Sequence, residues 1–323
     1  MEIDGLRTEF RIDGVWRAAV DGVSLSVARG ETLALVGESG CGKSITALSV
    51  MGLVPQPAGR IGGGHIRLEG EDLVGLPEER MEKLRGDRMA MIFQEPMTSL
   101  NPVMTIGDQV AEALLLHRGL SKAEARRQAL AVLEEVKIPS AAMRFDDYPH
   151  QFSGGMRQRV MIAIALACEP ALLLADEPTT ALDVTIQAQV LGLLADLKAS
   201  RGMAMLFITH NLGVVAQIAD RVAVMYAGQI VEHGEVADIF ARPGHPYTRA
   251  LFAAIPRMDI AGQELVAIGG RVPPLDAMPA GCRFAPRCGL ARRGCELPQK
   301  LVEAADGHLV RCHVTTMGAR ANA

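Results

Sequence analysis

The chain has 323 residues, of which 49% are hydrophobic and 22% are charged, as is typical of a globular protein. This length is sufficient for about two domains, and the composition excludes a largely disordered chain. The formal net charge is −4, but residues 242–323 contain 11 Lys and Arg against 6 Asp and Glu, a local charge of +5. This basic tail can contact an acidic partner, although a solvated basic surface explains it equally well.

The sequence does not predict export or a membrane span. The first residues contain neither a basic nor an apolar segment, so we expect no secretory signal. The longest apolar run, Val160 to Cys168, has nine residues, well short of the ~20 needed to cross a bilayer. We therefore expect a cytoplasmic protein whose six cysteines are not paired in disulfides.

The first part of the chain is predicted to be rich in strands. Alternating apolar residues predict short strands, and Gly and Pro predict the breaks between elements. In chain order, the predicted elements are strands at 6–12, 23–27 and 33–36, a helix from 43 until 55, a loop at 56–64, a strand at 65–69, a helix near 78–84 and a strand at 88–93.

After Gln94 the pattern becomes helical and later returns to alternating strands and helices. The second helix of the insert opens with the capping-box pattern Ser121-x-x-Glu124. This alternation predicts a largely parallel sheet with helices on both faces. The predicted elements are helices at 106–117, 121–136 and 155–167, a strand at 171–175, a helix at 184–199, a strand at 204–209, a helix from 212, a hairpin at 221–232 and a short helix at 247–255.

A phosphate-binding loop stands between the buried strand at 33–36 and the helix that follows it. Residues 37–44 read G-E-S-G-C-G-K-S, which matches G-x-x-x-x-G-K-[ST] with a strand before it and a helix after it. The backbone N–H groups of the loop and the helix N-terminus can surround a nucleotide phosphate. Lys43 is expected to reach the β- and γ-phosphates, and Ser44 to coordinate Mg²⁺.

Two further segments carry chemistry suited to phosphates. Asp176 and Glu177 follow an apolar strand, so they are expected at the carboxyl edge of a sheet, with Asp176 on Mg²⁺ and Glu177 polarising the attacking water. Ser153, Gly154 and Gly155 precede an apolar helix and form a second helix N-terminus suited to phosphate. Since both helix ends cannot easily face one γ-phosphate in the same subunit, the second is expected to serve a nucleotide held by a partner chain.

The order and spacing of these motifs resemble those of ATP-binding cassette (ABC) ATPases, and more narrowly the ATP-binding subunits of oligopeptide and dipeptide importers. The resemblance covers essentially the whole chain. The segments that carry it are the phosphate loop at 37–44, Gln94 after Met91-Ile92-Phe93, the stretch 94–102, the stretch 148–159 with its Ser-Gly-Gly, Asp176-Glu177-Pro178, Ala181-Leu182-Asp183, Thr209-His210, Val224-Met225-Tyr226-Ala227-Gly228 and His245-Pro246-Tyr247.

The resemblance implies a role for each matching residue. Gln94 would sense the γ-phosphate and Mg²⁺, Glu177 would be the general base and His210 the γ-phosphate switch residue. Asp183 would lie in the loop between the two sites of a dimer. The predicted ATP-binding residues are Phe10, Gly37, Ser39, Gly40, Cys41, Gly42, Lys43, Ser44, Ser153, Gly154, Gly155 and Asp183, with Ser44, Gln94 and Asp176 on Mg²⁺.

Two aromatic residues compete for the adenine base. Phe10, at the end of the first strand, is the better match to the position that usually stacks on the base, and Trp16 is its rival. Met156 departs from the general cassette pattern, which has glutamine there. The peptide-import subfamily shares this methionine, so the change does not weaken the expectation of catalysis.

Four cysteines are concentrated in the tail. Cys282, Cys288, Cys295 and Cys312 have the spacing C-x₅-C-x₆-C-x₁₆-C, looser than zinc knuckles, and four thiolates suit either zinc or a [4Fe-4S] cluster. Nearby arginines would offset the negative charge of such a centre. The resemblance favours the iron–sulfur cluster, because some peptide-importer cassettes carry one in a similar tail.

We therefore expect an α/β protein with a P-loop (RecA-like) ABC ATPase core, an antiparallel β edge, a helical subdomain and a small Cys-rich C-terminal extension. The expected domains are a core at 1–94 and 161–233, a helical subdomain at 95–160 and the extension at 234–323. The expected function is ATP hydrolysis that energises uptake of di- or oligopeptides. Nickel or glutathione as cargo, and a non-transport ABC ATPase acting on nucleic acid, are the alternatives.

The resemblance also implies partners. We expect a paralogous ATPase subunit, or a second copy of this chain, bound head to tail through ATP. Two permease subunits, seated over the region of 94–102, and indirectly an extracytoplasmic substrate-binding protein complete the assembly. The chain would then lie at the cytoplasmic face of the inner membrane, with no nucleic-acid partner.

Overall fold

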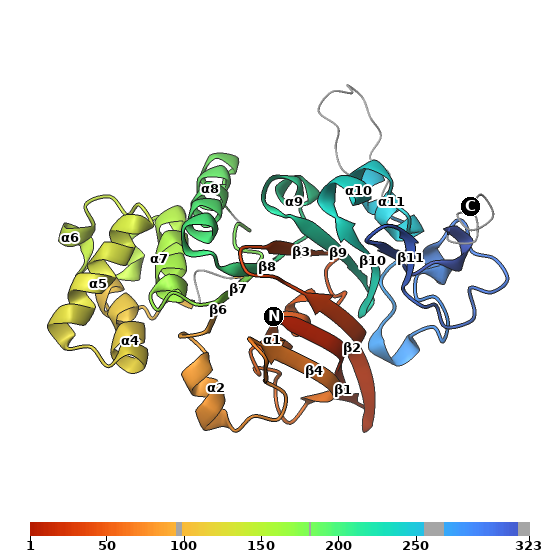
Figure 1. Ribbon diagram of the computed structural model, residues 1–323, viewed down its shortest axis with the longest axis horizontal. Helices are drawn as coiled ribbons and strands as arrows, with labels where there is room; N and C mark the ends of the chain where they lie inside the picture. The colour runs from red at the N-terminus through yellow and green to blue at the C-terminus, as the bar shows by residue number, and fades with distance from the viewer. Residues whose placement is uncertain (95–98, 181, 255–267, 316–323) are drawn as a thin grey trace. The chain divides into compact units, whose positions relative to one another are not determined.

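The computed structural model describes residues 1–94, 99–180, 182–254 and 268–315 (Figure 1). It divides into two compact units, each built from segments far apart in sequence. Unit 1 comprises Met1–Ser26, Thr32–Val74 and Ile208–Ala323, whereas unit 2 comprises Val27–Glu31 and Gly75–Phe207. The expected starting segment of the helical insert, residues 95–98, and also Ala181 and Ile255, lie outside the described residues.

Unit 1 contains a four-stranded antiparallel sheet. Alternate positions of a strand share one face, and in β2 the alternate residues Val23 and Leu25 are buried while Ser24 between them is exposed. The two strands expected at the start of the chain are confirmed, and both begin earlier than predicted. In spatial order the strands are β2 (Val15–Ser26), β1 (Glu2–Ile12), β4 (Gly59–Leu68) and β5 (Glu71–Asp72).

The loop expected at 56–64 is wrong in its second half, because β4 already begins at Gly59. Glycine has a low strand propensity, so its frequency here favours a loop. The structure shows another reason for it. A Cβ atom on Gly64, which has φ +84°, would lie 2.5 Å from the carbonyl oxygen of Gly5 on the neighbouring strand β1. Close approach of two strands therefore requires glycine at this position.

A second group of strands in unit 1 combines parallel and antiparallel pairing. Every residue of β3 is buried, and β3 runs parallel to β9, as expected for a strand covered on both faces. The expected hairpin is confirmed as β9 and β10, whereas the last two strands were not predicted. The spatial order is β11 (Val302–Ala305), β12 (His308–Val310), β10 (Gln229–Glu235), β9 (Arg221–Tyr226) and β3 (Thr32–Val36).

Within the described residues of unit 1, four α-helices accompany these strands. The phosphate-loop helix ends earlier than predicted, at Val50 rather than near Pro55. The helices are α1 (Lys43–Val50), α9 (Leu212–Ile218), α10 (Val236–Ala241) and α11 (Pro246–Ala253).

Unit 2 holds parallel strands and most of the long helices. β6 (Met89–Ile92) and β7 (Leu172–Asp176) pair in parallel. The next strand in the sheet beside β7 is β8 (Ala204–Thr209), of which the first four residues belong to unit 2. The Ser121–Glu124 capping box is confirmed at the start of α5. Helices α4, α5 and α7 pack on one another (Figure 1). The helices are α2 (Glu78–Leu84), α4 (Ile106–Arg118), α5 (Lys122–Glu135), α6 (Ala141–Arg144), α7 (Gly154–Leu166) and α8 (Val184–Arg201).

The α/β fold class with an antiparallel β portion is confirmed. Among the helices that the structure describes, none combines the length and the apolar character needed to span a bilayer.

Candidate functional site

The phosphate loop in unit 1 follows β3 and leads directly into α1. Its first residue, Gly37, has φ +154°, and a Cβ atom there would lie 2.2 Å from the backbone oxygen of Met225. Any larger residue would push the loop away from β9, so the packing of β3 against β9 requires glycine here. The loop is also tied to the β9–β10 turn, since the Gly228 N–H donates to the Cys41 carbonyl at 2.7 Å.

Lys43 lies inside this loop rather than in solvent. It is 6% exposed, and its Nζ donates to the carbonyl oxygens of Gly37 at 2.8 Å and Glu38 at 3.0 Å. The first turn of α1 contains no acidic residue, so the positive end of the helix is not neutralised within its own first turn. The loop thus combines an ammonium group, backbone N–H groups and a helix N-terminus, an arrangement that binds phosphate.

A second constellation occupies the carboxyl ends of two adjacent parallel strands in unit 2. Gln94 stands two residues beyond β6, and Glu177 directly follows β7. The Gln94 Nε2 donates to the Glu177 Oε2 at 3.2 Å. Asp176, the last residue of β7, is 4% exposed. Since ligands of α/β proteins bind at the carboxyl ends of strands, these side chains are placed to act on a bound group.

The backbone and neighbours of Glu177 fix the direction of its carboxylate. Its φ is +47°, which is uncommon for a residue other than glycine and is found often at active sites. The Thr180 hydroxyl also donates to Glu177 Oε2, at 2.9 Å. Two hydrogen bonds therefore orient one oxygen of the carboxylate.

The Ser-Gly-Gly segment forms an exposed helix N-terminus, as expected. Ser153 is the N-cap of α7, and its Oγ accepts the Met156 N–H at 3.4 Å. Ser153 and Gly154 are exposed, and the first turn of α7 carries no acidic residue. Asp183 caps α8 in the same manner, accepting the Ile186 N–H at 2.9 Å.

The predicted site residues are divided between the two units. The phosphate loop and His210 belong to unit 1, whereas unit 2 contains Gln94, Ser153, Asp176, Glu177 and Asp183.

His210 and the two aromatic residues occupy the places that the sequence indicates. His210 directly follows β8 and is exposed. Phe10 lies near the end of β1, opposite Gly59 of β4 and partly buried. Trp16 lies on β2, where the Arg60 guanidinium stands 4.1 Å above its ring.

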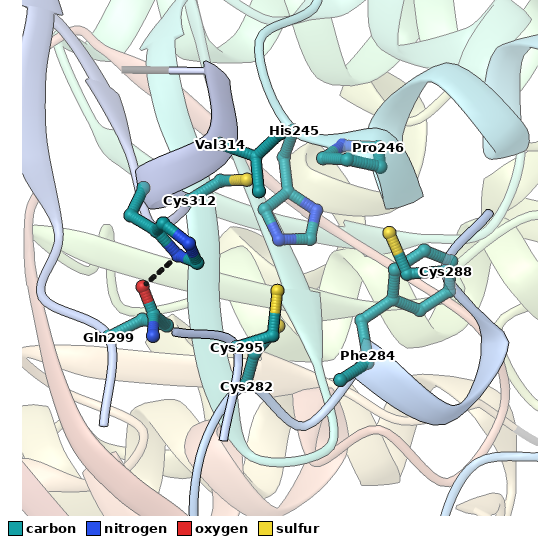
Figure 2. Close-up of a pocket in the computed structure, with 11 residues that line it drawn as sticks. His245, Pro246, Cys282, Phe284, Cys288, Cys295, Gln299, Cys312 and Val314 are labelled. Atoms are coloured by element: carbon teal, nitrogen blue, oxygen red, sulfur yellow. Dashed lines mark hydrogen bonds between the residues drawn. The ribbon is translucent and has the colours of Figure 1, made fainter. Parts of the chain in front are cut away.

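The four tail cysteines line one small cavity of about 10 Å³, together with His245 and His313 (Figure 2). Burial raises the pKa of the Cys282 and Cys288 thiols. Burial lowers the pKa of His245 to about 3, so this imidazole is neutral. Four residues separated by up to 30 positions in sequence thus converge on one enclosed space.

Whether these residues suit a metal centre can be judged from their donors. Over residues 1–94, 99–180, 182–254 and 268–315, no group of three or more His, Cys, Asp or Glu side chains is arranged to hold a metal ion. Backbone N–H groups nevertheless point at sulfur, from Leu290 to Cys288 and from Arg292 to Cys295, each at 3.4 Å. The buried Nε2 of His313 has no hydrogen-bond partner within the described part of the chain. Thiols are the donors that a thiolate-bound centre uses, but the described side chains do not form a ligand arrangement.

Sequence reasoning missed the contacts that the tail makes with the phosphate loop. Arg287 forms two bonds to the Glu38 carboxylate, and the Tyr247 hydroxyl accepts the Glu38 N–H. The crowding of arginines around the cysteines was the available signal, but it indicated charge compensation for a metal rather than a contact with residue 38.

Comparison with known proteins agrees with this architecture. Residues 20–180 match the family described as ABC transporter, and residues 231–295 match that described as Oligopeptide/dipeptide transporter, C-terminal region. The oligopeptide transport ATP-binding protein AppD of Bacillus subtilis (strain 168) is 53% identical, over 97% of this chain and 95% of AppD. A peptide import ATP-binding protein of Brucella abortus (strain 2308) is 51% identical, over 97% of this chain and 94% of that protein.

Solved structures show the same fold. The dimeric post-hydrolysis ATP-binding cassette MJ0796, bound to ADP and Pi, superposes with a TM-score of 0.65 at 27% identity, over 73% of this chain and 98% of that one. The fold and the phosphate loop define an ATP-binding cassette. The chain belongs to the ABC transporter family, in its oligopeptide/dipeptide transporter branch. It is an ATP hydrolase.

Proposed function

We propose that this chain hydrolyses ATP to energise uptake of di- or oligopeptides through partner permeases. The observation that carries the cargo assignment is the match of residues 231–295 to the oligopeptide/dipeptide transporter C-terminal region. The names of AppD and the Brucella proteins support it, since each is described as acting in peptide transport or import.

Each part of the ATP chemistry is assigned to particular residues. Lys43 and the loop N–H groups bind the phosphates of ATP, and Ser44, Gln94 and Asp176 hold Mg²⁺ directly or through water. Glu177 is the general base for the attacking water, and His210 contacts the γ-phosphate. Phe10 stacks on adenine. The burial of Lys43 within the loop and the bond between Gln94 and Glu177 support these assignments.

The working unit is proposed to be a head-to-tail pair of cassettes. Ser153–Gly155 of each subunit completes the ATP site of the other, and Asp183 lies between the two sites. The exposed N-terminus of α7 supports this, because its N–H groups remain accessible to a phosphate from another chain. The partner is a paralogous ATPase, and a homodimer is the alternative. The core at 1–94 and 161–233, the helical subdomain at 95–160 and the extension at 234–323 remain our proposed domains.

The pair acts at the cytoplasmic face of the inner membrane, beneath two permease subunits that receive cargo from an extracytoplasmic binding protein. Uptake of a radiolabelled tripeptide by cells that lack this chain tests the cargo. Wild-type protein should restore uptake, and Glu177→Gln should not. Restoration of nickel or glutathione uptake without uptake of the radiolabelled, ordinarily α-linked tripeptide would overturn the peptide assignment.

We further propose that Cys282, Cys288, Cys295 and Cys312 hold a [4Fe-4S] cluster with a structural role in the tail. The shared cavity and the N–H groups directed at sulfur support it. Anaerobic purification followed by visible absorption and iron, sulfide and zinc analysis tests this. Four iron and four sulfide per chain are expected, and Cys295→Ser should lower both. A colourless protein with stoichiometric zinc would contradict the cluster, and the four cysteines would then be a zinc site instead.

A further inference from the structure

One residue of the phosphate loop, Glu38, is held by the tail. Its carboxylate accepts two hydrogen bonds from the Arg287 guanidinium, Nη1 to Oε2 at 2.7 Å and Nη2 to Oε1 at 3.0 Å. Its backbone N–H donates to the Tyr247 hydroxyl at 2.8 Å. Its carbonyl oxygen accepts from Lys43 Nζ at 3.0 Å. Side chain and backbone of Glu38 therefore link the tail to the lysine of the phosphate loop.

The ion pair is shielded from water on the arginine side. The Arg287 side chain is 4% exposed and that of Glu38 is 29% exposed. The bonds to Glu38 raise the pKa of Arg287. Bidentate pairing in such surroundings is stronger and more directional than a surface ion pair. If Arg287 moves, Glu38 should therefore move with it, because water does not easily replace the ion pair.

Arg287 is itself fixed by the rest of the tail. Its Nε donates to the Gly269 carbonyl at 2.7 Å, and Nη2 donates to that of Ile268 at 3.2 Å. The guanidinium lies 5.7 Å from the ring centre of Tyr226 and 5.9 Å from that of Phe284. Nearly every direction around the guanidinium is thus occupied by a defined contact.

Tyr247 belongs to the same aromatic group. It is fully buried, and its ring centre lies 4.6 Å from that of Tyr226 and 5.3 Å from that of Phe284. Its hydroxyl therefore has little freedom to follow Glu38 if the loop moves. Tyr247 and Arg287 hold different parts of one residue from one packed cluster.

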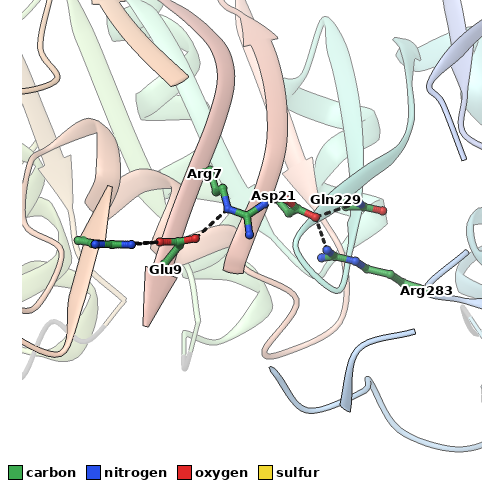
Figure 3. Close-up of polar contacts among 6 residues, drawn as sticks. Arg7, Glu9, Asp21, Gln229 and Arg283 are labelled. Atoms are coloured by element: carbon green, nitrogen blue, oxygen red, sulfur yellow. Dashed lines mark hydrogen bonds and ion pairs between the residues drawn. The ribbon is translucent and has the colours of Figure 1, made fainter. Parts of the chain in front are cut away.

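The turn that carries Arg287 also carries two of the cavity cysteines. The Ala285 N–H donates to the Cys282 carbonyl at 3.0 Å, and the Cys288 N–H donates to the Ala285 carbonyl at 3.2 Å. Arg283 in this turn bonds Asp21 of β2, which also accepts from Arg7 and Gln229 (Figure 3). The segment 282–288 is thus anchored to β2 at one point and to the phosphate loop at another.

We infer that the tail sets the ATP affinity of the phosphate loop: Arg287 and Tyr247 are positioning residues that hold Glu38 in place. This inference rests on the proposed function, in which the loop binds ATP. The inference gives neither residue a contact with the nucleotide. Their effect is on the conformation of the loop, and therefore on ATP affinity.

Nucleotide titration of the purified full chain tests the inference. Arg287→Met should weaken Mg-ATP binding roughly 5-fold or more, the lower end of usual coupling between sites. It should raise KM for ATP and leave kcat within about twofold, because the variant binds the substrate and the transition state more weakly by the same amount. Arg287→Lys should restore part of the affinity. Arg271→Met, which removes an exposed arginine of the same tail, is the matched control and should bind as the wild type does.

A double-mutant cycle separates coupling from general damage to the fold. In a Glu38→Gln background, Arg287→Met should have little further effect on affinity, because its partner is already changed. If instead the loss of ATP affinity in the double variant equals the product of the losses in the two single variants, the inference is wrong.

Hydrogen exchange on the wild-type chain provides a readout that needs no variant of the tail. Mg-ATP should slow amide exchange in peptides covering 284–288, and it should not do so in Lys43→Ala. Failure of the wild type to bind ATP would contradict the proposed function itself. Normal binding with unchanged exchange at 284–288 would contradict only the inference.

Discussion

The side-chain amide of Gln94 donates a hydrogen bond to the carboxylate of Glu177, with 3.2 Å between Nε2 and Oε2. The two residues follow adjacent parallel strands, so the register of β6 and β7 determines their distance. Gln94→Ala should slow turnover roughly 10- to 100-fold, because the carboxylate loses an orienting bond, and it should also weaken Mg-ATP binding, because Gln94 is proposed to hold Mg²⁺. Steady-state kinetics measure both. Gln128→Ala, on the exposed face of α5, is the control, and equal turnover in the two variants would refute the role of Gln94.

ATP should assemble the chain into pairs. Glu177→Gln protein, which retains ATP, should double in mass by light scattering when Mg-ATP is added, alone or with its paralogue. Introducing Ser153→Arg into the Glu177→Gln protein should prevent pairing, because a bulky cation would occupy the exposed N-terminus of α7. Ala123→Arg, on exposed α5, places the same charge elsewhere and should still permit pairing. If no mixture changes mass with ATP, the proposed shared site is wrong.

His233 should make stability depend on pH. Burial, with a smaller contribution from Arg221, lowers the pKa of His233 to about 4 from 6.5. The unfolded chain therefore binds more protons than the native one between these values, so stability is full above pH 6.5 and is lost as the pH falls toward 4. The loss should be about 1.4 kcal/mol per pH unit.

Urea unfolding of the wild type and His233→Asn from pH 7 to pH 4.5 measures this effect. The variant should be less stable at pH 7 and show a shallower decline with falling pH. His150→Asn, at an exposed histidine, is the control. A parallel decline in His233→Asn and the wild type would show that His233 is not the responsible group.

Features that depend on local sequence could be predicted, and those that depend on distant pairing could not. The phosphate loop and the Ser121 capping box each require only a few consecutive residues, and both were located correctly. The glycines of β4 indicated a loop, because the close approach of β1 is not visible in the local sequence. The Arg287–Glu38 pair joins residues 249 positions apart, so no spacing pattern marks it. The roles of the individual site residues remain predictions.

ATP binding and ATP hydrolysis should depend on different residues, with Lys43 in the phosphate loop serving binding and Glu177 after β7 serving hydrolysis. Mg-ATP affinity and turnover measured side by side on two variants test this most directly, with Glu134→Gln on exposed α5 as the control. Lys43→Ala should lose tight ATP binding. Glu177→Gln should retain binding and hydrolyse ATP roughly 10²- to 10⁴-fold more slowly, as expected for loss of a general base. A Glu177→Gln protein that hydrolyses ATP at the wild-type rate would contradict the account.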